Sequence, residues 1–466
     1  MYFEQFYLGC LAHASYMVGS EGVAAVVDPQ RDVEVYLEAA RQNNLRIAHV
    51  IESHLHADFV SGHGELAART GAKIYVGARA GAQFPHVAVR EGDEVRFGQC
   101  RLQFLETPGH TIESISVLVT DLERSPEPFA VLTGDTLFIG DVGRPDLSPG
   151  YTPQQLAGLL YDSLHQKLLG LPDGVRVYPA HGAGSLCGRQ MSTERSSTIG
   201  EQRVKNYALR AAGRDEFIHL LTDSLPERPA YFARDAEINR TGAPALDDLP
   251  PLAELSPAAL ARMQETGVIV LDTRPDIQFA AAHVPGSVNI PLSGQFASWA
   301  GALLGLENEL ILVADDLDRV QESRLRLARV GIERVAGYLA GGIEAWRRED
   351  RPVAQLPQIT VQDLARLQRD AADLQIADVR REAEWDEAHI DGALLLPLNQ
   401  LAAAILGGKS QLDPAHPVAV HCKSGYRSAI AASLLRRAGF RQVINVTGGF
   451  DAWKAAGLPL AQAAAA

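Results

Sequence analysis

The sequence predicts a multidomain α/β protein, and three observations support this fold class. Short strand-like apolar runs near the start of the chain end at histidine or aspartate. A strand-loop-helix pattern near the end of the chain has a related copy upstream. The 466 residues exceed one domain, and segments rich in proline and aspartate at 241–251 and 350–357 have the composition of linkers. We therefore expect three domains, over residues 1–245, 250–355 and 356–466.

Composition limits the function classes. The formal net charge of −14 argues against binding to nucleic acid or to an anionic membrane surface. No apolar run approaches the roughly 18 residues of a membrane span, and the start of the chain lacks the basic residues of a signal peptide. The four cysteines are scattered without disulfide or zinc-knuckle spacing, which suits a reducing compartment. We expect a cytoplasmic protein that binds neither nucleic acid nor membrane, and we expect it to form a homo-oligomer.

Three strand-like runs in the N-terminal domain, at 47–53, 102–107 and 129–133, each end close to potential metal ligands. Imidazole and carboxylate together are typical ligands of a divalent transition metal. A single histidine near a strand end is more often an ordinary surface or hydrogen-bonded residue, but several at successive strand ends favour a metal site. The side chains concerned are His54, His56, Asp58, His110 and Asp135.

These segments resemble the metallo-β-lactamase superfamily. The His-x-His-x-Asp motif, the Pro-Gly-His-Thr loop, the Thr-Gly-Asp strand end and the Tyr-Pro-Ala-His segment ending at His181 occur in the expected order. The resemblance implies a four-layer αββα sandwich with a metal at its edge. Dinuclear hydrolases of the superfamily have a histidine directly after the aspartate of the first motif, whereas this chain has Phe59. Because an apolar ring removes a ligand from the second metal position, the sequence favours a mononuclear site.

Within the superfamily, the segment 141–146 resembles the persulfide dioxygenases, which hold one Fe(II) through two histidines and one carboxylate. Such a triad leaves positions open for O2 and a substrate sulfur, although the same ligand types also suit zinc. The resemblance implies one iron per chain, held by His54, His110 and Asp135. It also implies nearby residues that orient ligands or water, namely His56, Asp58 and His181.

Arg144 lies in the same segment and is a candidate contact for an anionic substrate. An arginine two positions before an aspartate can equally form a structural ion pair. The sequence leaves both roles open, with Asp146 as the partner in the second.

Near the end of the chain, an apolar run at 418–421 ends at Cys422, and a short loop leads into a helical stretch from 429 to 439. Loop amides, the helix N-terminus and the charge of Arg427 would stabilise a thiolate or a persulfide on this sulfur. A buried structural cysteine is the alternative, but its polar neighbours are poor core residues. We therefore expect a nucleophilic Cys422. The loop residues expected to bind substrate are Lys423, Ser424, Gly425 and Tyr426.

The Cys422 loop resembles the active-site loop of rhodaneses, which are sulfurtransferases. The flanking segments Asp378–Arg380, Ala388–Gly392 and Gly448–Trp453 resemble the other signatures of that domain. The resemblance implies that Cys422 carries sulfur as a persulfide.

The rhodanese signatures recur upstream at an offset of 106 or 107 residues, which predicts a second rhodanese-like domain. In that copy Ala314 stands opposite Cys422, so no thiol is available there. The neighbouring Asp315, Asp316 and Asp318 would repel an anion. We expect this copy to be catalytically inactive and to serve packing or docking.

The whole chain resembles bacterial fusions of a persulfide dioxygenase with one inactive and one active rhodanese domain, which act in sulfide detoxification. The resemblance implies that a low-molecular-weight persulfide and O2 give sulfite, and that Cys422 transfers a sulfane sulfur to sulfite, giving thiosulfate. One alternative is a zinc-dependent thiolester hydrolase of the glyoxalase II kind, with His56 and His181 as direct ligands; Phe59 argues against it. The other is a non-oxidising sulfur-carrier or docking protein, which the inactive copy supports.

Cys187 follows His181 by six residues on a glycine-rich loop. We expect this loop at the mouth of the metal site, with small neighbours that leave the thiol accessible. A cysteine packed under the loop is the alternative. The fusions carry a cysteine in a matching Gly-Ser-x-Cys-Gly stretch, which favours a catalytic role in which Cys187 accepts or passes a persulfide sulfur.

Overall fold

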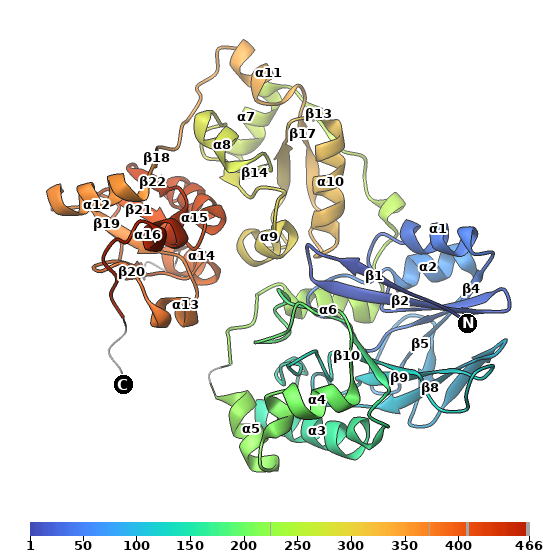
Figure 1. Ribbon diagram of the computed structural model, residues 1–466. Coiled ribbons are helices and arrows are strands. Elements are labelled where there is room, and N and C mark those ends of the chain that lie inside the picture. The colour runs from blue at the N-terminus through green and yellow to red at the C-terminus, as the bar shows by residue number, and fades with distance from the viewer. Residues whose placement is uncertain (224, 372, 407–409, 463–466) are drawn as a thin grey trace. The chain divides into compact units, whose positions relative to one another are not determined.

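The computed structural model describes residues 1–223, 225–371, 373–406 and 410–462 (Figure 1). The chain divides into two compact units. The N-terminal unit comprises Met1–Leu249 together with Ala328–Gly331, and the C-terminal unit comprises Pro250–Leu327 and Ile332–Ala466. Among the described residues, no helix is long and apolar enough to cross a membrane.

Two six-stranded sheets form the centre of the N-terminal unit. Each sheet mixes antiparallel pairs with at least one parallel pair. The first sheet contains, in spatial order, β1 (Tyr2–Leu8), β2 (His13–Ser20), β3 (Val23–Val27), β4 (Arg46–Ile51), β5 (Lys73–Gly77) and β6 (Val87–Val89). The second contains β12 (Ser197–Thr198), β11 (Arg176–Pro179), β10 (Ala130–Gly134), β9 (Ile115–Asp121), β8 (Cys100–Glu106) and β7 (Glu94–Phe97).

The two sheets of the N-terminal unit face each other across a shared apolar core, which includes Tyr16, Phe104 and Val117. Helices cover the opposite faces. On the first sheet these are α1 (Glu34–Gln42) and α2 (His63–Thr70), and on the second they are α3 (Pro153–Gln166) and α5 (Arg214–Thr222). β9 and β10 lie between the first sheet and the helices, so both strands are buried along their whole length. The result is the predicted four-layer αββα sandwich. This unit also contains α4 (Ile199–Lys205) and α6 (Phe232–Thr241).

The C-terminal unit contains two five-stranded sheets with the same strand order, all of whose strand pairs are parallel. The first has β13 (Ala253–Leu255), β17 (Val335–Leu339), β16 (Leu310–Val313), β14 (Ile269–Asp272) and β15 (Val288–Asn289). The second has β18 (Gln358–Ile359), β22 (Val443–Val446), β21 (Val418–His421), β19 (Gln375–Asp378) and β20 (Leu394–Leu395). Because carboxyl ends of parallel strands meet at one sheet edge, the residues after β19 and β21 lie close together.

Helices connect the parallel strands of both sheets, and equivalent contacts recur in the two copies. Trp346 and Trp453 each donate their indole proton to a proline carbonyl six residues later, at 2.8 Å. The first copy has α7 (Pro257–Glu265), α8 (Asp276–Ala281), α9 (Phe296–Leu304), α10 (Leu317–Ala328) and α11 (Gly342–Arg348). The second has α12 (Val361–Asp370), α13 (Glu382–Glu387), α14 (Leu398–Leu406), α15 (Tyr426–Arg437) and α16 (Gly449–Ala455). The repeat seen in the sequence is therefore a repeat of fold.

Candidate functional site

Strand ends of the N-terminal unit bring three predicted ligands together. His54 follows β4, His110 follows β8 and Asp135 follows β10. The three residues are at most 2% exposed, and one ligand atom of each lies within 4.8 Å of the others. His54 Nε2 and His110 Nε2 lie 3.9 and 3.4 Å from the same oxygen, Asp135 Oδ2. Ligand atoms about 2.1 Å from a common ion lie about 3 to 4 Å apart, so this spacing suits a metal.

Hydrogen bonds orient the two imidazoles with Nε2 toward Asp135. His110 Nδ1 lies 2.9 Å from the carbonyl oxygen of Arg144, and because a carbonyl only accepts, Nδ1 carries the proton. His54 Nδ1 lies 3.0 Å from Ser53 Oγ. Burial lowers the pKa of both histidines, which favours the neutral imidazole, the form that can bind a metal. Neither Nε2 has a hydrogen-bond partner within the part of the chain that the structure describes, as expected of metal-binding atoms.

Two glycines permit this close packing. A Cβ at Gly143 would lie 2.0 Å from the main-chain oxygen of Asp135 and 2.8 Å from His110 Nδ1. Gly134 has a φ of +51°, and a Cβ there would lie 2.6 Å from Ser53 Oγ. A side chain at either position would therefore displace a candidate ligand or a residue that supports one.

A second group of ligand atoms lies beside the first and comprises His56, Asp58 and His181. His181 links the two groups, with Nδ1 2.7 Å from Asp135 Oδ1 and Nε2 2.9 Å from Asp58 Oδ2. Burial lowers the pKa of His181, but the charges of Asp135 and Asp58 outweigh burial and raise it well above its usual value. Its imidazole can therefore orient the carboxylate of Asp135 by hydrogen bonding.

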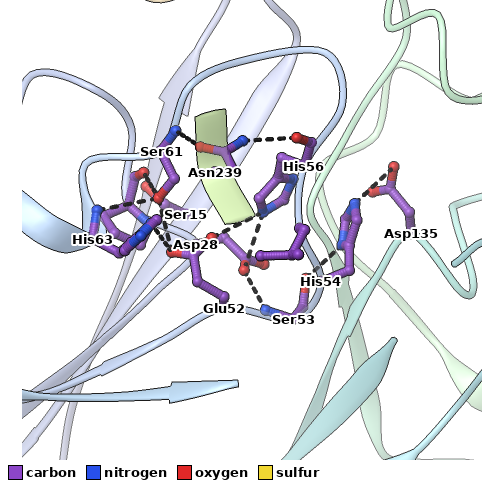
Figure 2. Close-up of polar contacts among 12 residues, drawn as sticks. Ser15, Asp28, Glu52, Ser53, His54, His56, Ser61, His63, Asp135 and Asn239 are labelled. Atoms are coloured by element: carbon purple, nitrogen blue, oxygen red, sulfur yellow. Dashed lines mark hydrogen bonds and ion pairs between the residues drawn. The ribbon is translucent and has the colours of Figure 1, made fainter. Parts of the chain in front are cut away.

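His56 of the second group also belongs to a buried polar network (Figure 2). His56 Nε2 lies 3.2 Å from Asp28 Oδ1 and 3.9 Å from Glu52 Oε2. Asp28 Oδ1 also accepts from the main-chain amide of Ser53 at 2.6 Å. Asp28 has a φ of +53°, which costs a residue other than glycine about 1 kcal/mol or more. Asp28 was not predicted from the sequence, although it directly follows the apolar run Val23–Val27 and so stands at a strand end as Asp135 does.

Asn239 of α6 holds the loop that carries the metal motif (Figure 2). Its Nδ2 donates to the carbonyl oxygens of His56 and Phe59, both at 2.7 Å. Its Oδ1 accepts from the amide of Ser61 at 2.8 Å, and the side chain is fully buried. No pattern around the motif indicates this residue, because Asn239 follows Ser61 by 178 positions.

Phe59 faces the second group of ligand atoms. Its ring centroid lies 4.4 Å from that of His56 and 6.3 Å from that of His181. The ring of His13 packs against it at 4.1 Å. Phe59 therefore fills space beside the second group without offering a ligand atom. His13 was not predicted, because the start of β2 reaches the site through a β-bridge with His181, a residue far away in the sequence.

Cys187 is buried, in contrast to the accessible thiol expected from its small neighbours. It is 1% exposed, and its Sγ lies within 4.8 Å of ligand atoms of Asp135 and His181. Burial, followed by the charges of Asp58 and Asp135, raises the pKa of the thiol well above its usual value. The amide of Arg144 donates to the carbonyl of Cys187 at 3.0 Å and holds the Cys187 loop against the two groups of candidate ligand atoms. Cys187 thus lies beside the two groups of candidate ligand atoms, as expected, but its thiol is not accessible to solvent.

Arg144 forms the structural ion pair that the sequence left open. Its Nε and Nη2 donate to the two oxygens of Asp146 at 2.7 and 2.9 Å. The guanidinium also donates to the carbonyls of Leu186 and Pro226, and the side chain is only 6% exposed. With these partners, Arg144 supports the loops around the site, and the structure favours this role over substrate contact.

In the C-terminal unit, Cys422 follows β21 and its loop leads directly into α15. The amide of Gly425 donates to Cys422 Sγ at 3.1 Å, as expected for a loop that stabilises an anionic sulfur. Gly425 has a φ of +121°, a conformation that favours glycine. Lys423 and Ser424 are exposed, whereas Tyr426 is half-buried. Lys423 and Ser424 are therefore open to solvent, and their role in substrate binding stays a prediction.

Arg427 is paired, which differs from the free charge expected beside Cys422. Its Nη1 and Nη2 donate to the carboxylate of Glu384 at 2.6 and 2.7 Å. Burial raises the pKa of Glu384, but the bonds to Arg427 outweigh burial and lower it to about 2. The sulfur therefore experiences a reduced positive charge from Arg427, because the carboxylate offsets part of it.

The equivalent loop of the first copy has no nucleophile. Ala314 follows β16 as Cys422 follows β21. Asp315, Asp316 and Asp318 are all exposed, so the loop presents negative charge to solvent. The chain's cysteines are all free and lie elsewhere, at Cys10, Cys100, Cys187 and Cys422.

Family models match three parts of the chain. The model of the metallo-beta-lactamase superfamily matches residues 8–181. The model of the rhodanese-like domain matches residues 256–349 and again residues 360–456. The two rhodanese matches confirm the predicted repeat.

Individual relatives carry two different enzyme names. Mouse "Persulfide dioxygenase ETHE1, mitochondrial" is 30% identical over 211 residues, covering 44% of this chain and 73% of the relative. The hydroxyacylglutathione hydrolase of Rhodospirillum rubrum is 32% identical over 220 residues, covering 46% of this chain and 80% of the relative. Among solved structures, a metallo-beta-lactamase from Staphylococcus aureus subsp. aureus COL is 31% identical with a TM-score of 0.66, covering 73% of this chain and 98% of that one.

Proposed function

The chain belongs to the metallo-β-lactamase superfamily and carries two rhodanese-like domains, and on this basis we propose that it is a persulfide dioxygenase with sulfurtransferase activity. Similarity to a persulfide dioxygenase together with the rhodanese-like domains supports an enzyme of sulfur metabolism. In the proposed first reaction, a low-molecular-weight persulfide, O2 and water give a thiol and sulfite. In the second, the outer sulfur of a Cys422 persulfide bonds to sulfite, the sulfur-sulfur bond to Cys422 breaks, and thiosulfate and the thiolate are released.

The observation that best supports this proposal is the buried group of His54, His110 and Asp135, in which both Nε2 atoms have no hydrogen-bond partner among the described residues. Two imidazoles and a carboxylate suit Fe(II). A bound Fe(II) would supply one-electron chemistry and open positions for O2 and a substrate sulfur. Phe59, beside the second group, supports a single metal ion because it offers no ligand.

The chain's own residues have separate roles in this proposal. His181 orients Asp135, and Asn239 holds the loop that carries His56 and Asp58. Cys187 is a candidate to accept or pass a persulfide sulfur, because its Sγ lies beside Asp135 and His181. The proposed setting is the cytoplasm, with the enzyme as a homo-oligomer whose partners are small molecules.

Oxygen uptake after addition of glutathione persulfide tests the proposal, with sulfite and thiosulfate measured as products. Metal content should be determined on protein purified with and without air. We expect about one iron per chain and oxygen uptake that produces sulfite in proportion. A fully active preparation with two zinc ions per chain would overturn the proposal.

A zinc-dependent thiolester hydrolase is the second candidate, and a specific observation supports it. His56, Asp58 and His181 converge as a second group of ligand atoms beside the first, as two adjacent metal ions would require. The similarity to a hydroxyacylglutathione hydrolase agrees with this reading. Hydrolysis of a glutathione thiolester by the zinc-loaded protein, without oxygen uptake, would select this candidate.

A further inference from the structure

Within the C-terminal unit, a turn of the cysteine-less copy contacts the first residue of α15. Tyr426 donates its hydroxyl proton to the carbonyl of Pro291 at 3.1 Å. A Cβ at Gly294 would lie 3.4 Å from the Tyr426 ring, so the turn packs closely against that ring. Tyr426 directly follows Gly425, whose amide donates to Cys422 Sγ. The turn therefore contacts the residue next to the amide that binds the sulfur.

Arg326 of α10 holds this turn in place. Its Nη1 donates to the carbonyl of Leu292 at 2.6 Å, and its Nη2 to the carbonyl of Gly294 at 3.3 Å. The guanidinium carbon also lies 5.6 Å from the ring centroid of Phe296. Arg326 is buried, with a side chain 10% exposed. A residue of the cysteine-less copy is thus connected through one turn to Tyr426.

The same copy contacts α15 at two further points. The amide of Asn289, in β15, donates to Ser433 Oγ at 3.0 Å. Arg437, at the end of α15, donates to the carbonyl of Gly286 at 3.0 Å. The helix is therefore held along its length, and of these three contacts the one at Tyr426 lies beside the sulfur.

We propose that the cysteine-less copy positions the Cys422 loop through Tyr426, which makes it a working part of the sulfurtransferase site. The inference rests on the proposed transfer of sulfur by Cys422. Hydrogen bonds to an anionic sulfur weaken steeply when the donor is misaligned, so the Gly425 amide must be held in direction. Tyr426, the next residue along the chain, can do so because its hydroxyl and its ring are both held by the turn. The hydroxyl remains a donor, since burial raises the pKa of Tyr426.

Two variants test this positioning role from its two ends. Tyr426→Phe removes the bond to Pro291, and Arg326→Met releases the turn without touching the Cys422 loop. In each, sulfur transfer from thiosulfate to cyanide should fall about fivefold, as loss of one hydrogen bond would produce. The pH profile of Cys422 alkylation by iodoacetamide should move to higher pH in both. The double variant should be no worse than the poorer single variant, because both changes act through one contact.

Arg437→Met is the matched control, because it breaks a contact with the same copy at the far end of the same helix. It should leave transfer and the alkylation profile unchanged. If Tyr426→Phe or Arg326→Met behaves like Arg437→Met, or if all three lose activity in proportion to their melting temperatures, the inference is overturned. Alkylation requires no sulfur transfer, so an inactive wild-type protein would refute the proposed function while the profile still tested the positioning of Cys422.

Discussion

Glu384 and Arg427 face each other as a two-point ion pair beside the Cys422 loop, with nitrogen–oxygen distances of 2.6 and 2.7 Å. The pair holds the pKa of Glu384 at about 2, below its usual value of 4.5. A carboxylate with a lowered pKa contributes stability that is fully present above the unfolded value and is lost as the pH falls toward the folded value. The pair should therefore stabilise the C-terminal rhodanese fold above about pH 4.5 and lose its effect between that pH and about 2.

Glu384→Gln tests this pH dependence. At neutral pH the variant should melt at a lower temperature than the wild type, because Arg427 loses a charged partner. The difference should shrink as the pH falls below 4.5, where the wild-type carboxylate begins to lose its charge. Calorimetry of the full chain between pH 7 and pH 3 measures this difference in melting temperature. Glu387→Gln, which changes an exposed glutamate on the same helix, is the control. A difference that does not change with pH would contradict the assignment.

His110→Ala should lose both bound metal and oxygen uptake. The substitution removes one of the two imidazoles that face Asp135, and removal of a ligand weakens metal binding strongly. Elemental analysis gives the metal content, and an oxygen electrode gives the activity. His86→Ala removes an exposed imidazole of the same unit and should change neither. Full iron content in His110→Ala would show that the metal lies elsewhere.

Cys422→Ser should separate the two reactions. Oxygen uptake and sulfite release should continue, because the proposed metal ligands belong to the N-terminal unit. Thiosulfate formation should fall to background, since a serine hydroxyl cannot carry a sulfane sulfur. Measurement of sulfite and thiosulfate after addition of glutathione persulfide tests this separation. Loss of oxygen uptake in this variant would mean that Cys422 supplies the substrate of the metal site.

Cys187 should gain sulfur during turnover if it accepts or passes a persulfide. Cys187 and Cys422 are both 1% exposed, so neither thiol should react rapidly with iodoacetamide in the resting protein, and the raised pKa of Cys187 should slow its reaction further. Mass spectrometry after brief exposure to persulfide should then show added sulfur on both cysteines. If Cys187 remains unmodified, and Cys187→Ser leaves the ratio of sulfite to thiosulfate unchanged, the residue is structural.

Asn239→Ala should destabilise the loop that carries His56 and Asp58. The change leaves the carbonyls of His56 and Phe59 and the amide of Ser61 without this partner, and each buried unsatisfied group costs about 1–3 kcal/mol. The melting temperature and the metal content should both fall. Asn239→Asp is the informative comparison, because it keeps the acceptor for Ser61 but removes the donor. Wild-type metal content in both variants would show that metal binding does not depend on the hydrogen bonds of Asn239.

Local patterns were sufficient to predict the repeat in the C-terminal half and the positions of the candidate metal ligands, whereas the αββα sandwich was implied by the resemblance to the metallo-β-lactamase superfamily. His54, His110 and Asp135 each follow an apolar run, and such runs become neighbouring strands whose ends converge. Gly425 likewise marked the turn that brings an amide to Cys422. Each of these features depends on residues that are close in sequence, so spacing and residue type carry the information.

Other features depend on packing between distant segments, and only the tertiary structure decided them. Asn239 contacts Ser61, which lies 178 positions earlier in the chain, and Glu384 contacts Arg427, which lies 43 positions later. Cys187 is surrounded by small residues that suggest exposure, yet its loop is held against the two groups of candidate ligand atoms by a bond from Arg144. Burial and pairing are properties of surfaces that meet only after folding. A local pattern determines which elements form, but the partner that a side chain meets depends on how those elements pack.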